Sequence, residues 1–285
     1  MTTYLADKAE NLTVEGPSAT FTYRRLGPRG GTPLVLLHRF RGTIDLWDPE
    51  FVDLLAADHD VIMFDNVGVG YTTGEPRDSL QGFTDGAVEF IEALGLPKAD
   101  LLGWSMGGVV AQDMALRRPD LVRKFIVAGS GPAAWLPDTP PMSEKVLSIM
   151  PRMPEFTEGD LTFLFYPDTE AGNAAARRHF DNLATRLDAG SPPASLEATQ
   201  GMLAALDKML ARPFAEVAEE LKTIKHPVLY ANGLHDVMIP AHASYVAVQH
   251  LDNSVLVLYS DAGHGFLFQH AKDFTAQVTS FLAAS

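Results

Sequence analysis

The segment Asp100-Leu101-Leu102-Gly103-Trp104-Ser105-Met106-Gly107-Gly108 decides the fold. It opens with a short apolar run, residues 100–103, which is typical of a strand covered on both faces. Residues 106–118 then place apolar side chains at helical spacing. Between these two patterns, Gly103, Ser105 and Gly107 match G-x-S-x-G, the motif of a tight strand-to-helix turn that projects a serine hydroxyl beyond the sheet. We therefore predict Ser105 at such a turn.

Short apolar runs alternate with helical patterns along most of the chain. The predicted strands are residues 20–26, 33–38, 60–65, 100–103, 124–128, 226–231 and 253–259. The predicted helices are residues 45–57, 84–94, 106–118, 242–250 and 271–284. Strands that alternate with helices predict an α/β fold, in which a mostly parallel sheet has helices on both faces. Residues 131–213 break the alternation, and their scattered apolar side chains indicate an insertion of helices and loops.

Composition excludes several classes of function. The chain has 285 residues, of which 46% are hydrophobic and 20% charged, which is typical of a globular protein. It has no cysteine, so disulfides, thiolate metal sites, iron–sulfur clusters and a cysteine nucleophile are excluded. Lys and Arg total 22 against 36 Asp and Glu, and the net charge of −14 disfavours nucleic acid and anionic membranes as partners.

The sequence predicts neither a membrane anchor nor a cofactor. No secretory signal and no apolar stretch of membrane-spanning length is visible, so we expect a cytoplasmic location. Gly68 and Gly70 superficially resemble a dinucleotide fingerprint, but they lead into Glu75-Pro76 and not into a helix. No histidine cluster suggests a metal site.

Two later segments supply partners for Ser105. Asp236 follows the predicted strand 226–231, and His264 follows the predicted strand 253–259. Ligands of such sheets bind beyond the carboxyl ends of the strands, which is where both residues fall. A serine hydroxyl needs a base that is oriented by a third group. The order Ser105, Asp236, His264 is typical of one known arrangement, so we predict Ser105 as nucleophile, His264 as base and Asp236 as its orienting acid.

Other residues compete for these roles. His235 adjoins Asp236, but neighbouring side chains on a strand point to opposite faces. Asp261 lies only three residues before His264, where it is better placed to cap a turn. Asp65 ends a predicted strand, and we expect a structural role for it in the following turn.

These motifs together resemble the α/β-hydrolase superfamily over nearly the whole chain. Residues 65–72 (DNVGVGYT) are similar to the family segment D-x-R-G-x-G-x-S, with Val67 in place of the arginine. The resemblance implies an eight-stranded sheet, a core domain of residues 1–133 and 216–285, and an inserted helical cap (lid) of residues 134–215. Phe40 and Ser105-Met106-Gly107-Gly108 are similar to the cofactor-free haloperoxidase, perhydrolase and arylesterase group.

The resemblance also implies an oxyanion hole made by the backbone N–H groups of Phe40 and Met106. The loop that carries Phe40 reads His38-Arg39-Phe40-Arg41-Gly42, where the family usually has His-Gly-x. We expect His38 to be a buried brace of this loop. Arg39 and Arg41 either meet an anionic substrate or pair with nearby acids such as Asp45 and Asp48.

We therefore expect a serine hydrolase that acts without a cofactor. Its predicted partner is a small, partly apolar carboxylic ester, thioester or lactone, cleaved through an acyl-enzyme on Ser105. Trp104, Trp135, Arg39 and His38 are candidates for the pocket lining. A serine at the nucleophile position argues against epoxide hydrolases and haloalkane dehalogenases, which attack through a carboxylate. Perhydrolase or haloperoxidase, lyase or acyltransferase chemistry on the same triad, and ligand binding without catalysis, stay open as alternatives.

Overall fold

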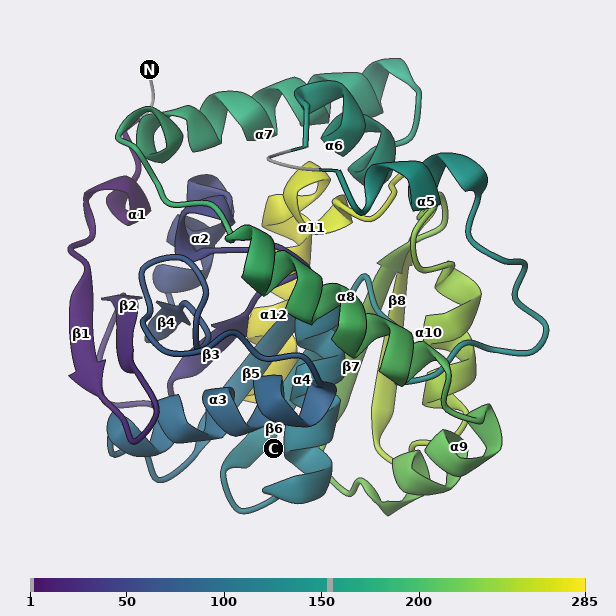
Figure 1. The fold of residues 1–285 in the computed structure, drawn as a ribbon, viewed down its shortest axis with the longest axis horizontal. Coiled ribbons are helices and arrows are strands. Elements are labelled where there is room, and N and C mark those ends of the chain that lie inside the picture. Colours follow the sequence, from purple (N-terminus) through teal and green to yellow (C-terminus); the bar gives the residue numbers. More distant parts are fainter. Residues whose placement is uncertain (1–2, 153–155, 285) are drawn as a thin grey trace.

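The centre of the structure is one eight-stranded sheet with strand order β1-β2-β4-β3-β5-β6-β7-β8 (Figure 1). The computed structural model describes residues 3–152 and 156–284. Strands β3 to β8 run parallel, and only the pairs β1–β2 and β2–β4 are antiparallel. The strands are β1 (Leu12–Glu15), β2 (Thr20–Leu26), β3 (Leu34–Leu37), β4 (Val61–Phe64), β5 (Ala99–Trp104), β6 (Val122–Ala128), β7 (Val228–Gly233) and β8 (Ser254–Tyr259). This confirms the predicted mostly parallel sheet.

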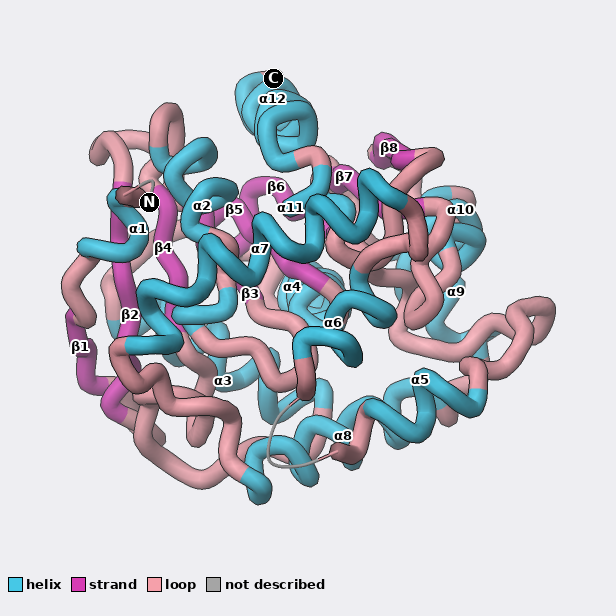
Figure 2. The backbone as a smooth tube through the Cα atoms, turned by 90° about the horizontal axis from the view of Figure 1, so that it is seen from above, coloured by secondary structure: helices cyan, strands magenta, loops and turns pink. Residues whose placement is uncertain are grey.

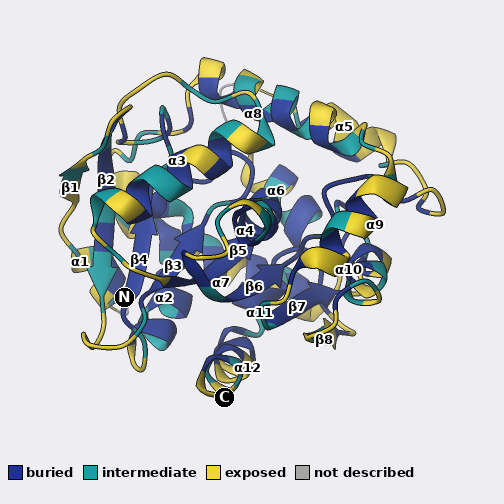
Figure 3. Ribbon diagram, turned by 90° about the horizontal axis from the view of Figure 1, so that it is seen from below, coloured by how far each residue is buried: buried dark blue, intermediate teal, exposed yellow. Residues whose placement is uncertain are grey.

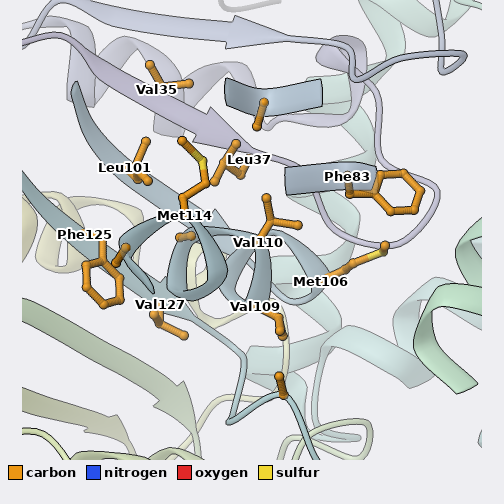
Figure 4. Close-up of a cluster of buried hydrophobic side chains, with 14 of the residues drawn as sticks. Val35, Leu37, Phe83, Leu101, Met106, Val109, Val110, Met114, Phe125 and Val127 are labelled. Carbon is orange, nitrogen blue, oxygen red and sulfur yellow. The ribbon is translucent and has the colours of Figure 1, made fainter. Parts of the chain in front are cut away.

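The two-residue period of the strands divides the core between the two faces of the sheet. In β3, Val35 and Leu37 belong to one hydrophobic cluster, and Leu34 and Leu36 belong to another (Figure 4 shows the first). The first cluster includes side chains from α3 (Leu80–Ala93), α4 (Met106–Arg117), α8 (Leu196–Leu210), α9 (Phe214–Thr223) and α10 (Ala241–Val248). The second includes side chains from α2 (Pro49–Ala56), α11 (Phe266–Gln269) and α12 (Ala271–Ala283). Figure 3 shows α4 and the central strands in the buried interior, whereas the edge strands β1 and β8 carry exposed residues.

Helices occupy most of the segment between β6 and β7. They are α5 (Glu144–Ile149), α6 (Glu158–Phe165), α7 (Glu170–Asp188), α8 and α9. Helix α7 packs on α2, α6 and α11, and α8 packs beside α3. Figure 2 shows α7 crossing in front of the central strands in the view from above. Among the described helices, none combines the length and the apolar character needed to cross a membrane.

Local capping explains where two helices differ from their predicted bounds. The predicted helix 45–57 is a short 3-10 turn, η1 (Ile44–Leu46), followed by α2, because the Asp48 side chain accepts a hydrogen bond from the Glu50 N–H at 2.9 Å and so caps α2. The predicted helix 84–94 begins earlier, at Leu80, because Ser79 caps it in the same way. The helix α1 (Leu5–Lys8), β1 and α11 were not predicted, since four residues are too few to show a period.

The connections of the sheet reverse direction between β3 and β5. The chain leaves β3 through α2 toward β4 on one side, and it leaves β5 through α4 toward β6 on the other side. Open α/β sheets bind ligands beyond the carboxyl ends of the strands at such a switch point. The loop 38–42 follows β3 and Ser105 follows β5, so both lie at this point.

Two glycines allow α4 to approach the end of β3. A Cβ atom on Gly107 would lie 2.1 Å from the carbonyl oxygen of Leu37 and 2.8 Å from that of His38. A Cβ atom on Gly103 would lie 2.1 Å from the carbonyl oxygen of Gly107. These distances are far shorter than van der Waals contact, so a side chain at either position requires the backbone of α4 or β3 to move.

Replacing Gly107 with alanine tests this contact. We expect Gly107→Ala to lower the free energy of unfolding by about 3 kcal/mol, because the added methyl group meets backbone atoms that cannot rotate away. Gly31→Ala is the matched control. A Cβ atom at Gly31 would meet no other atom within 4 Å, and Gly31 does not have a positive φ. Urea unfolding followed by circular dichroism measures both. Equal, small effects of the two substitutions would contradict the close packing.

Candidate active site

Ser105 sits on a strained turn between β5 and α4. Its φ of 57° and ψ of −119° are unfavourable for a residue with a Cβ atom. Two backbone hydrogen bonds hold this conformation, because the Ser105 N–H donates to Ala128 O and the Gly108 N–H donates to Ser105 O, each at 2.8 Å. The turn places Ser105 at the carboxyl end of β5, in the wall of a cavity.

Backbone pairing brings the segments of Asp236 and His264 together. The Leu234 N–H donates to Tyr259 O and the His235 N–H donates to Ala262 O, both at 2.9 Å, beyond the ends of β7 and β8. The Asp236 Oδ2 atom accepts a hydrogen bond from His264 Nδ1 at 2.7 Å. Its Oδ1 atom accepts the N–H groups of Met238 and Ile239 at 2.8 Å. The carboxylate is therefore buried and fully hydrogen-bonded.

This pairing fixes the tautomer of His264. A carboxylate only accepts hydrogen bonds, so Nδ1 carries the proton that Asp236 accepts, and Nε2 of the neutral ring has a free lone pair. Nε2 is buried and has no hydrogen-bond partner among the described residues. The imidazole packs against Trp104 and Phe165, with ring centroids 5.5 and 5.7 Å away. The ring is thus held in one orientation with an unused basic atom.

The loop after β3 forms a closed turn. The Gly42 N–H donates to Arg39 O at 2.9 Å, and Arg41 adopts a φ of 57° inside the turn. Within the described chain, the Phe40 N–H makes no hydrogen bond. Met106 is the first residue of α4, so its N–H has no acceptor within the helix. Phe40 and Met106 both line the Ser105 cavity. Arg39, where the family usually has glycine, is therefore compatible with a turn at this position.

His38 and Asp65 form hydrogen bonds to the backbone near this loop. His38 Nε2 lies 2.7 Å from Phe64 O, so it donates there, and burial lowers the pKa of His38 to about 3. Asp65 accepts the N–H groups of Ile44 and Tyr71 at 2.8 and 2.9 Å, and burial raises the pKa of its carboxyl to about 7. Neither geometry involves the Ser105 hydroxyl. Val67, in place of the family arginine, is fully buried in the first hydrophobic cluster.

A mostly apolar cavity of about 70 Å³ lies beside Ser105. Phe40 and Met106 line it together with Ser105. The other walls come from the segment after β6, from α8 and from the loop after β7, and include Trp135, Met142, Met150, Met209, Met238 and Ile239. Methionine side chains adapt to ligand shape, so this wall suits an apolar group without demanding one outline.

The predicted pocket residues do not all line the cavity beside Ser105. Trp135 lines the cavity, and its Nε1 donates to Thr139 O at 3.1 Å. Trp104 lies outside that cavity, where its Nε1 donates to His264 O at 3.1 Å. Arg39 and His38 line a neighbouring hollow with Met106. Trp104 therefore supports the histidine and does not border the cavity beside Ser105.

The acids proposed as partners of Arg39 and Arg41 are engaged elsewhere. Asp45 forms an ion pair with Arg24 at 2.6 Å, and Asp48 bonds to His179 at 2.9 Å. Arg39 donates from Nη1 to Phe40 O at 2.7 Å, and Arg41 donates from Nη1 to Arg152 O at 2.7 Å. The alternative that Arg39 pairs with Asp45 or Asp48 is therefore wrong.

The competing histidine and acid lie away from this arrangement. His235 is exposed to solvent. Asp261 accepts a hydrogen bond from His270 Nε2 at 2.9 Å, and not from His264. In the described ranges, 3–152 and 156–284, no cluster of three or more acidic or histidine side chains could hold a metal ion.

Phe165, at the end of α6, is a site residue that the sequence did not single out. Its ring packs on His264, and its carbonyl oxygen accepts the Gly265 N–H at 2.8 Å. The inserted helices thus bond directly to the loop of the histidine. Only its apolar character marked Phe165 in the sequence, and nearby Leu161 and Leu164 share that character.

The strained turn predicts a difference between two variants that both lack the hydroxyl. We expect Ser105→Gly to be more stable than Ser105→Ala by about 1 kcal/mol, because glycine adopts a positive φ without strain, and this gain exceeds its larger unfolded-state entropy. Thermal unfolding of the two variants measures the difference. A more stable alanine variant would show that the turn is not strained.

The imidazole of His38, whose side chain is 11% exposed, predicts acid sensitivity. Its folded-state pKa lies below the ordinary value of about 6.5, so the neutral ring stabilises the fold above that pH and the contribution is lost as the pH falls toward the folded-state value. We expect the free energy of unfolding to fall by about 2 kcal/mol more in wild type than in His38→Gln between about pH 8 and about pH 5, as measured with urea. The glutamine keeps a donor for Phe64 O. His242→Gln, at an exposed position, should behave as wild type, and an identical pH dependence of His38→Gln would contradict the assignment.

Comparisons with known proteins agree with this architecture. The sequence matches the α/β-hydrolase fold family over residues 32–271. It is 28% identical to a 2-hydroxymuconate semialdehyde hydrolase from Pseudomonas sp. strain CF600, over 89% of this chain and 87% of that protein. An α/β-hydrolase fold protein from Chitinophaga pinensis superposes with a TM-score of 0.87 at 30% identity, covering 98% of this chain and 99% of that one.

A more distant structure shares the fold alone. The enol-lactonase from Burkholderia xenovorans LB400 superposes with a TM-score of 0.77 at 19% identity, covering 96% of this chain and all of that one. The family match extends from before β3 to the start of α12, and so includes the Ser105 turn and the loops of Asp236 and His264. The chain belongs to the α/β-hydrolase family.

Proposed function

We propose that this protein is a serine hydrolase that cleaves a small, partly apolar carboxylic ester, thioester or lactone through an acyl-enzyme on Ser105. The observation that carries the proposal is the state of His264. Its Nδ1 is bound to the buried carboxylate of Asp236 at 2.7 Å, whereas its Nε2 is buried without a partner in the described chain. A base prepared in this way suits proton removal from a serine hydroxyl.

The mechanism follows from these groups. His264 Nε2 accepts the Ser105 hydroxyl proton while Oγ forms a bond to the substrate carbonyl carbon, and Asp236 stabilises the imidazolium. The N–H groups of Phe40 and Met106 donate to the oxyanion of the tetrahedral intermediate. The intermediate collapses, the bond to the leaving alcohol, thiol or lactone oxygen breaks, and His264 returns the proton to it. His264 then removes a proton from water, which attacks the acyl-enzyme and releases the acid and Ser105.

The cavity beside Ser105 supports a small acyl group. Its volume of about 70 Å³ and its apolar walls disfavour long or charged acyl chains. A relative of similar length is named as a hydrolase, which supports water as the acceptor of the acyl group. Perhydrolysis, lyase chemistry and acyl transfer would use the same residues with another resolving step, and they are distinguished by product analysis.

We further propose that residues 134–215 act as a cap over this site. The support is that Trp135, Met142, Met150 and Met209 from this segment line the Ser105 cavity, and that Phe165 contacts His264. In this proposal the core of residues 1–133 and 216–285 supplies the reacting groups, and the cap selects the acyl group.

A panel of p-nitrophenyl esters with increasing acyl length tests the proposed reaction. We expect turnover to be highest for acetate to butyrate and to fall for octanoate, because the cavity is small. Ser105→Ala and His264→Ala should lower kcat by about 10³-fold or more, and Asp236→Asn by about 10²-fold or more, as expected for groups that act as a unit. Ser148→Ala, at an exposed serine of α5, is the control and should match wild type.

Labelling with a fluorophosphonate gives a second readout. We expect stoichiometric labelling that Ser105→Ala abolishes. A folded wild-type protein that neither reacts with the label nor hydrolyses any ester would overturn the proposed function. Release of a product other than the free acid would replace hydrolysis by one of the alternative resolving steps.

A further inference from the structure

Arg39 is a buried cation without an acidic partner in the described chain. Arg39 is only 8% exposed, and no carboxylate among the described residues lies within 4 Å of its guanidinium. The guanidinium lies over two rings, 5.4 Å from the centre of Trp104 and 5.2 Å from that of Phe165. One Nη1 hydrogen bond goes to Phe40 O, and Nε has no partner. Burial and the nearby Arg41 lower the pKa of Arg39 to about 9, so it is still charged at neutral pH.

A cavity of about 140 Å³ adjoins this side of the loop. Its polar lining consists of Arg39, Arg41, Thr43 and Ser191, and no acidic side chain of the described chain lines it. Thr43 Oγ1 is buried and makes no hydrogen bond with any described residue. Arg39 and Thr43 thus carry donors that no described residue accepts, and both residues line a cavity that no described acidic side chain lines. Buried donors are normally satisfied, which indicates that an anionic group completes this site.

A carboxylate fits these donors best. The planar fork of a guanidinium pairs with the two oxygens of a carboxylate, and the Arg39 Nε atom has no hydrogen-bond partner among the described residues. The net charge of −14 gives the protein no general attraction for anions. Local recognition by these side chains is thus the means by which an anionic substrate would be retained.

Arg39 and the Trp104 ring that it contacts are sequence neighbours of the proposed reacting groups. Arg39 directly precedes Phe40, whose side chain lines the cavity beside Ser105. Trp104, whose ring lies beneath the Arg39 guanidinium, directly precedes Ser105. A substrate with its apolar acyl group beside Ser105 would therefore extend its other part past the oxyanion loop toward Arg39.

We propose that Arg39, together with Thr43, binds a carboxylate on the leaving-group side of the substrate, and so selects monoanionic esters, thioesters or lactones. This inference rests on the proposed hydrolase function. It assigns Arg39 a role in specificity, while Ser105, His264 and Asp236 perform the reaction.

Matched neutral and anionic esters test the proposal. The pairs are 3-acetoxybenzoate with 3-acetoxybenzamide and 4-acetoxybenzoate with 4-acetoxybenzamide, which differ in the charge of one group. We expect wild type to have a kcat/KM about ten-fold or more higher for the carboxylate in at least one pair. Arg39→Gln should reduce this ratio about ten-fold. Arg29→Gln, which removes an exposed arginine charge, should leave the ratio unchanged.

Each outcome decides the proposal. A ratio near one in both pairs, or a ratio that Arg39→Gln leaves intact while amide turnover still depends on Ser105, overturns the carboxylate site but not the hydrolase. If Arg39→Gln does not fold, Thr43→Val replaces it, and we expect the ratio to fall about three-fold without loss of a charge. If no ester is hydrolysed, the proposed function fails, and calorimetric binding of 3-hydroxybenzoate against 3-hydroxybenzamide decides the site: selective binding of the carboxylate supports it, and no selectivity overturns it.

Discussion

The close approach of α4 to the end of β3 is the constraint on which the site depends. Gly107 lies against the carbonyl groups of Leu37 and His38, where no side chain fits. Because β3 and β5 are neighbours at the switch point of the sheet, this contact brings the start of α4 and the loop 38–42 side by side. Met106 and Phe40 then line one cavity together with Ser105. Without the close contact at Gly107, the Ser105 turn and the loop 38–42 would not lie side by side.

Buried charged side chains in this protein are stabilised in two different ways, by polar partners or by aromatic rings. Asp236 is buried and accepts three hydrogen bonds, Asp45 forms an ion pair with Arg24, and Asp48 bonds to His179. Burying an unpaired ion costs several kcal/mol, so pairing of this kind is the usual condition for a buried charge. Arg39 differs from these residues, since it has no acid within ion-pair distance among the described residues and two aromatic rings stabilise it only in part. This contrast is what motivates the proposed carboxylate site.

A backbone hydrogen bond and a ring contact join the inserted helices to the loop that carries His264. The Gly265 N–H donates to Phe165 O at 2.8 Å, next to His264, and the Phe165 ring packs on the imidazole. A displacement of α6 would break this hydrogen bond and release one side of the ring. The position of these helices and the orientation of the His264 ring are therefore coupled, whereas the other side of the ring is held by the hydrogen bond to Asp236.

The sequence alone determined the mostly parallel sheet, the Ser105 turn and the chain positions of Asp236 and His264, because these depend on local periodicity and on strand-end motifs. Helix starts shifted by a few residues, since capping by Asp48 and Ser79 depends on side-chain geometry. Only the tertiary structure decided which charged groups pair. Arg24, Asp45, Asp48 and His179 come from distant segments, and their contacts leave Arg39 without an acid among the described residues. It also placed the Trp104 ring against His264 and the Arg39 guanidinium over the Phe165 ring, because packing between a core strand and an inserted helix leaves no periodic signal in the sequence.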